Sequence, residues 1–127
     1  MGMMKIFLNN KGQKNSQEEK IAGEEIKKEI LKVLKTHKTE GELSITFGDG
    51  ELLRKINKKY RKKNKTTDVL SFNLGDEKKI MGDIYISIPA AKKQAKEYNV
   101  SLKDELLRLA EHGTLHVLGY THKEMGL

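Results

Sequence analysis

The 127-residue sequence contains no cysteine, no tryptophan and one proline. Without cysteine the chain can form no disulfide and offers no thiolate to a metal, which fits a reducing compartment. Three Phe and four Tyr are its only large aromatic residues, so we expect base stacking to contribute little to any recognition of nucleic acid. The apolar run at residues 1–8 is too short for a signal peptide, and no later run could span a membrane. We therefore expect a cytoplasmic protein without a membrane partner.

Charged residues, by contrast, are abundant, and the excess of positive charge is confined to one segment of the chain. Charged residues make up 34% of the chain, and the formal net charge is +7. The segment 54–65, called the basic segment below, contains no acidic residue, and the rest of the chain carries 17 basic against 18 acidic residues. A local basic patch predicts a polyanionic partner, whereas a solvated lysine-rich helix end is the alternative. The candidate RNA-binding residues are Arg54, Lys55, Lys58, Lys59, Arg61, Lys62, Lys63 and Lys65.

Hydrophobic periodicity predicts one α+β domain over residues 1–127. Strands are expected at 4–8, 42–47, 67–74 and 82–88, with Leu70, Phe72 and Leu74 of the third strand facing the core. Helices should begin after the capping residues Ser16, Asp49 and Ser101, and a further helix should run from Pro89 through Tyr98. Tyr60 should point inward from the second helix. The order β-α-β-α-β-β-α-α predicts a small four-stranded mixed sheet with packed helices.

The stretch from His112 to His122 holds three of the four histidines, and the fourth, His37, lies far from it. Residues four apart share one face of a helix, so the imidazoles of His112 and His116 can reach one metal ion. Gly119 suits a left-handed helix stop, which would bring His122 back over the same point. Three nitrogen ligands without a fourth form an open site, as in catalytic zinc centres. Zinc is the metal expected, although nickel or copper would suit the same ligands.

This spacing is shared with the metzincin proteases, in which a glutamate that follows the first histidine is the general base. Gly113 occupies that position here, which argues against peptide hydrolysis. Glycine inside a helix costs about 1 kcal/mol relative to alanine, so a close approach by a strand or a substrate is expected at Gly113.

The motif from His112 to His122 resembles the signature of the YbeY family, bacterial metal-dependent endoribonucleases that act in ribosomal RNA maturation. Tyr60-Arg61, the run from Thr66 to Phe72 and the run from Gly82 to Ser87 resemble further motifs of that family, in the same order. Thr121 replaces the aspartate that usually precedes the last histidine.

The resemblance implies that His112, His116 and His122 bind one divalent metal ion and that Arg61 contacts phosphate. Catalysis would then depend on Arg61, His112 and His116. The implied activity is endonucleolytic cleavage of single-stranded RNA in ribosomal RNA maturation and ribosome quality control, with the ribosomal subunit or its associated proteins as partners. Either water or the ribose 2′-OH could attack. The alternative is a non-catalytic RNA- or ribosome-binding module with a structural metal, which the absence of a general base at Gly113 favours.

Overall fold

The computed structural model describes residues 4–10, 17–36, 40–76 and 79–119. These residues form one sheet in the order β1-β2-β4-β3, in which β1, β2 and β4 are parallel and β3 is antiparallel to β4. The predicted order of elements and the α+β class are confirmed. The elements are β1 (Met4–Asn10), α1 (Gln17–Thr36), β2 (Glu40–Gly48), α2 (Gly50–Arg61), β3 (Val69–Asn73), β4 (Lys79–Ser87), α3 (Ile88–Glu97) and α4 (Leu102–Val117).

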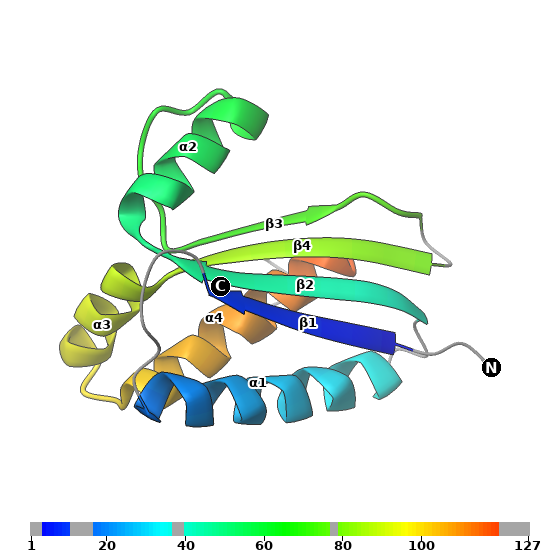
Figure 1. The fold of residues 1–127 in the computed structure, drawn as a ribbon, viewed down its shortest axis with the longest axis horizontal. Helices are drawn as coiled ribbons and strands as arrows, with labels where there is room; N and C mark the ends of the chain where they lie inside the picture. Colours follow the sequence, from blue (N-terminus) through cyan, green and yellow to red (C-terminus); the bar gives the residue numbers. More distant parts are fainter. Residues whose placement is uncertain (1–3, 11–16, 37–39, 77–78, 120–127) are drawn as a thin grey trace.

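Helices cover the two faces of the sheet unequally. Figure 1 shows α1 and α4 side by side on one face, α2 on the other, and α3 at one end. Successive residues of a strand point to opposite faces. Ile84 belongs to the core and packs against α4, so its neighbour Tyr85 lies on the face that α2 partly covers. We call the face of α1 and α4 the inner face and the face of α2 the outer face.

The hydrophobic core lies between the inner face and the helices α1 and α4. Apolar residues alternate along β2 and β4 and recur at helical spacing in α1 and α4, so each element buries one side. Among the described side chains of α1, the hydrophobic residues Ile26, Ile30 and Leu34 are fully buried. The core strands contribute Ile6, Leu43, Ile45, Phe47, Ile80, Ile84 and Ile86.

Side-chain caps begin three helices. Asp49 accepts a hydrogen bond from the backbone N–H of Leu52 at 2.9 Å, and Ser101 accepts one from Asp104 at 3.0 Å, so both predicted caps are confirmed. Ser87 caps α3, whose first turn holds the only proline of the chain. The cap predicted at Ser16 lies outside the described residues. No described helix combines the length and apolarity needed to cross a membrane.

Two sequence-based predictions about side-chain direction are wrong. For β3, Leu70 is buried as predicted, at 2% exposure, but it pairs with Tyr85 and lies outside the main core. The prediction is wrong for the rest of the strand, because Phe72 pairs with Asp83 and is only half-buried, and Leu74 is 72% exposed. Tyr60 was expected to point inward from α2 but is 57% exposed. The physical reason is the small size of α2, which covers only one end of the outer face and leaves the rest to solvent.

Candidate metal centre and nucleic-acid interface

Two glycines let α4 lie unusually close to β4. Gly113 faces Ile84, and a β-carbon on Gly82 would lie 2.8 Å from Cγ1 of Val117. Both glycines are buried, and real β-carbons do not approach so closely. The close approach expected at Gly113 is therefore confirmed, with a neighbouring strand as its cause. This packing fixes the rotation of α4, and hence the direction in which its histidines point.

His112 and His116 lie next to each other on one side of α4. Their ring centroids are 5.0 Å apart, the ring planes are inclined by 39°, and both side chains are half-buried. The spacing of four residues produces this arrangement, because it places both side chains over adjacent turns of one face. Half-burial leaves part of each imidazole accessible while restricting its rotamers, which suits a pair of ligands.

The donor set fits a divalent metal as far as the described residues extend. Two adjacent imidazoles offer nitrogen donors to one ion, with Zn–N distances of about 2.0–2.1 Å. Across residues 4–10, 17–36, 40–76 and 79–119, no three His, Asp or Glu side chains gather as a metal site. The predicted third ligand, His122, lies outside the described residues. Gly119 has a φ of +95°, so the predicted left-handed stop is confirmed.

An ion pair between the buried Glu105 and the partly exposed Arg108 lies on the same side of α4, one to two turns before the histidines. Glu105 is only 1% exposed, and its two carboxylate oxygens accept hydrogen bonds from Arg108 at 2.8 and 2.7 Å. The bond to Glu105 raises the pKa of Arg108 above its usual value. Arg108 also lies 5.6 Å from the centre of the Tyr98 ring. The pair therefore holds the Arg108 guanidinium in place on this side of α4, one turn before His112.

The start of β3 adds a second polar link beside this ion pair. Asp68 accepts a hydrogen bond from Gln94 of α3 at 3.1 Å and another from the backbone N–H of Val69 at 2.8 Å. The charge of Asp68 also acts on Arg108. Arg108, on the same side of α4 as the histidines, therefore lies near the end of α3 and the start of β3. Sequence reasoning missed the link between Asp68 and Gln94, because 26 residues separate them.

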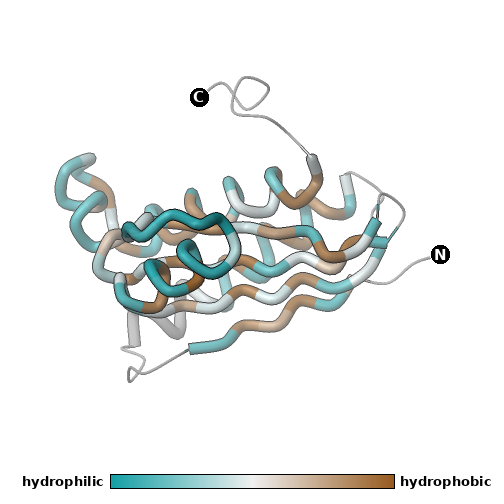
Figure 2. Tube along the Cα trace, turned by 90° about the horizontal axis from the view of Figure 1, so that it is seen from above, coloured by the Kyte–Doolittle hydropathy of each residue, from teal (hydrophilic) through white to brown (hydrophobic). Residues whose placement is uncertain are grey.

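The basic segment forms the end of α2 and the loop after it. All eight of its basic side chains are exposed, and Figure 2 shows this part of the chain as largely hydrophilic. Arg54 pairs with Glu51, and this bond raises the pKa of Arg54 and lowers that of Glu51. Asn57 is buried, and its side-chain amide donates to the carbonyl of Lys65 at 2.9 Å. This bond ties the basic loop to α2, a role that sequence reasoning missed.

Arg61 and the histidine pair lie on opposite faces of the sheet. Arg61 ends α2 on the outer face, whereas His112 and His116 lie on α4 along the inner face. Both helices contact β3, which pairs only with β4 among the described strands and so forms an edge. The two predicted parts of the site therefore lie on opposite faces of the sheet, and an extended ligand that reached both would have to pass over an edge such as β3.

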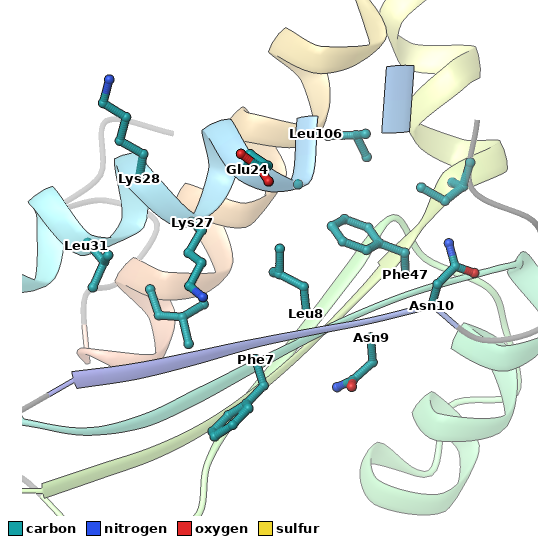
Figure 3. A pocket seen from close by; sticks show the side chains of 13 residues that line it. Phe7, Leu8, Asn9, Asn10, Glu24, Lys27, Lys28, Leu31, Phe47 and Leu106 are labelled. Carbon is teal, nitrogen blue, oxygen red and sulfur yellow. The ribbon is translucent and has the colours of Figure 1, made fainter. Parts of the chain in front are cut away.

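A cavity of about 940 Å³ lies at the other edge of the sheet, between β1 and α1. Figure 3 shows Leu8 and Phe47 on the side of α1, while Phe7 lies on the opposite side of β1. Glu24, Lys27 and Lys28 are the charged residues at the cavity. It contains none of the predicted site residues, so it is separate from the candidate metal centre.

The comparisons with known proteins agree with this fold and with the motifs on β3, β4 and α4. A match to the family described as Endoribonuclease YbeY covers residues 10–126. The chain belongs to this family. The endoribonuclease YbeY of Sulfurihydrogenibium sp. strain YO3AOP1 is 43% identical over 129 residues, which cover 91% of this chain and 84% of that protein. The endoribonuclease YbeY of Persephonella marina is 41% identical, over 95% of this chain and 80% of that protein.

A solved structure shows the same fold. The solution structure of TM1509 from Thermotoga maritima superposes with a TM-score of 0.65 at 26% identity, over 92% of this chain and 74% of that one. Membership of the endoribonuclease YbeY family supports an RNA-cleaving enzyme, and the non-catalytic alternative is not favoured. The family motifs quoted above occupy the end of α2, the loop to β3 and the strands β3 and β4, and the last of them begins in α4.

Proposed function

We propose that this protein is a metal-dependent endoribonuclease that cleaves single-stranded RNA during ribosomal RNA maturation and ribosome quality control, with zinc as its metal. The observation that carries the proposal is the histidine pair. His112 and His116 lie side by side on a helix whose rotation is fixed by Gly113 and Gly82, in a chain of the endoribonuclease YbeY family. The proposed partners are RNA and the ribosomal subunit or its associated proteins, in the cytoplasm.

The residues that would hold the metal are His112, His116 and His122. When bound, a divalent ion there would supply Lewis-acid polarisation of a phosphoryl oxygen and make a nearby water more acidic. The protein's own contribution is to hold two imidazoles at a fixed separation, with the Glu105–Arg108 pair keeping the adjacent turn of α4 rigid. A preorganised pair of ligands avoids reordering side chains when the metal binds.

The basic segment would bind the RNA backbone. Its eight exposed cations lie on the outer face, and neutralising phosphates there would release counterions and favour binding. Arg61 offers a planar fork of donors that suits a phosphate. Because β3 is an edge strand between α2 and α4, a flexible single strand can pass over it from the basic segment to the histidines. A stiff duplex is less able to make that turn, which favours a single-stranded substrate.

The proposal is tested by cleavage of an end-labelled single-stranded RNA. His116→Ala should lower the rate constant by at least about 100-fold, the loss expected when a group that supports charge in the transition state is removed. Arg61→Ala should lower kcat/KM, and EDTA should stop cleavage by the wild-type protein. His37→Ala is the matched control, because it removes the one histidine outside the motif, and it should cleave at the wild-type rate. Cleavage by His116→Ala and Arg61→Ala at the wild-type rate would overturn the proposal.

A further inference from the structure

Three aromatic rings form a row on the outer face, from Tyr85 in β4 through Phe72 in β3 to Tyr60 in α2. The ring centroids of Tyr60 and Phe72 are 5.5 Å apart with an interplanar angle of 54°, and those of Phe72 and Tyr85 are 6.5 Å apart with an angle of 70°. None of the three belongs to the core between the sheet, α1 and α4. The row becomes more exposed toward Tyr60.

The inner end of the row is fixed in place. The Tyr85 hydroxyl donates a hydrogen bond to Asp83 at 2.8 Å. Burial, followed by this bond, raises the pKa of Tyr85 to about 12, so the ring stays neutral. Phe72 packs on Tyr85 from the neighbouring strand. Tyr60, at the outer end, therefore rests on a rigid base although more than half of its surface is in solvent.

Tyr60 also lies in the middle of the basic segment. The ammonium of Lys59 is 5.1 Å from the centre of the Tyr60 ring, and the exposed Arg61, Lys62 and Lys63 follow directly in the chain. Lys59 is itself exposed, so its flexible side chain can leave the ring with little loss of packing. An accessible aromatic ring surrounded by cations is the combination that binds single-stranded nucleic acid, with stacking for a base and charge for the backbone.

We propose that Tyr60 is a stacking site for a base of single-stranded RNA, with Phe72 and Tyr85 supporting it and Lys59 moving from the ring to a neighbouring phosphate. The proposal rests on RNA being the substrate and adds a contact to the bases. It thereby revises the expectation that stacking contributes little. Because every base has a π face, the site should accept any of the four bases. It should favour unpaired bases, whose faces are accessible.

The experiment measures binding by fluorescence anisotropy with two labelled 12-mers of equal charge, a single-stranded RNA and an abasic ribose-phosphate chain. All proteins carry His116→Ala and the buffer contains EDTA, so no probe is cut. Tyr60→Leu should weaken binding of the RNA by about 5- to 150-fold, the range for loss of one stacked base. Its binding of the abasic chain should not change. Tyr60→Phe keeps the ring and should bind RNA within about threefold of the parent.

Tyr98→Leu is the matched control. Tyr98 is also 57% exposed and also has a cation near its ring, Arg108 at 5.6 Å, but it lies at the end of α3, outside the basic segment. This variant should bind both probes like the parent. A thermal melt of each variant checks that the fold is kept. RNA binding by Tyr60→Leu within twofold of the parent would overturn the stacking site. An equal loss on both probes would do the same, since it would show that Tyr60 only positions the basic segment.

The stacking proposal and the proposed function fail separately. If the wild-type protein cleaves RNA but binds the abasic chain as tightly as the RNA, the stacking site is wrong and the nuclease stands. If Tyr60→Leu loses base-dependent binding while the wild-type protein cleaves nothing, the stacking site stands and the nuclease activity is wrong.

Discussion

Gly113 in α4 and Ile84 in β4 pack so closely that a β-carbon on the glycine would lie 2.9 Å from Cγ2 of Ile84. His112 precedes this contact and His116 follows it by three residues, so the contact sets the height and rotation of both imidazoles. Gly113 lowers the helix propensity of α4, but it allows the helix, and with it the proposed metal ligands, to lie close to the sheet.

Gly113→Ala should destabilise the protein. Forcing a methyl group against Ile84 should lower the free energy of unfolding by about 1–2 kcal/mol, after allowing for the better helix propensity of alanine. The displaced helix should also bind zinc more weakly. Urea denaturation and a zinc titration measure the two effects. A variant as stable as the wild-type protein would show that α4 can move away from β4 without cost.

Gly119→Ala is the companion to that variant. The φ of Gly119 is +95°, but nothing lies within 4 Å of an added β-carbon. The strain is therefore in the backbone alone, and the cost should be about 1 kcal/mol. Because Gly119 precedes His122 in the chain, we expect the loss in free energy of zinc binding to exceed the loss in free energy of unfolding.

Arg108→Met should leave the carboxylate of Glu105 buried without its partner. Because Arg108 is partly exposed and water can reach the site, we expect a loss of about 2–3 kcal/mol, below the usual range for a broken buried pair. The double variant Glu105→Met/Arg108→Met removes both charges and should be more stable than Arg108→Met alone. Urea denaturation of the four proteins in this cycle gives the coupling energy. A double variant less stable than either single variant would contradict a pair held by mutual neutralisation.

Tyr85 should make the stability depend on pH in the alkaline range. Its folded pKa of about 12 lies above the ordinary value near 10, so the folded state keeps the proton that the unfolded state loses. The stabilisation is complete below about pH 10 and is lost as the pH rises toward 12. Chemical denaturation across this range should show a steeper loss for the wild-type protein than for Tyr85→Phe. Parallel curves would show that neither burial nor the bond to Asp83 raises the pKa of Tyr85 in the folded protein.

Neutralising the basic segment should weaken RNA binding and its salt dependence together. Replacing Lys58, Lys59, Lys62 and Lys63 with glutamine should reduce the slope of log K against log salt by about 3, since each contact to single-stranded nucleic acid contributes about 0.7. Lys92 and Lys93 on α3 are also exposed, and their replacement serves as the charge control. An unchanged slope in the fourfold variant would place RNA binding elsewhere.

Much of the fold could be predicted because its signals are local. Alternation and helical spacing gave the eight elements in order, and the caps at Asp49 and Ser101 depend on contacts three residues apart. The close approach at Gly113 followed from the cost of glycine in a helix. The resemblance of four motifs to one family gave the class of enzyme.

What the sequence did not reveal depends on non-local pairing. The alternation of Leu70 and Phe72 shows that one face of β3 is apolar, but only the register with β4 decides that this is the outer face. Tyr60 fits the apolar side of α2, yet its exposure depends on how much of the sheet that helix covers. The link between Asp68 and Gln94 and the anchoring of Lys65 by Asn57 join segments that only the fold brings together.

The most direct test of the metal centre is elemental analysis of purified protein, dialysed after loading with zinc. We predict one equivalent of zinc in the wild-type protein and in His37→Ala, and less than about a tenth of an equivalent in His112→Ala and His116→Ala, since a pair of ligands that acts together fails when either is removed. A full equivalent of zinc in both His112→Ala and His116→Ala would contradict a metal centre built on the histidine pair of α4.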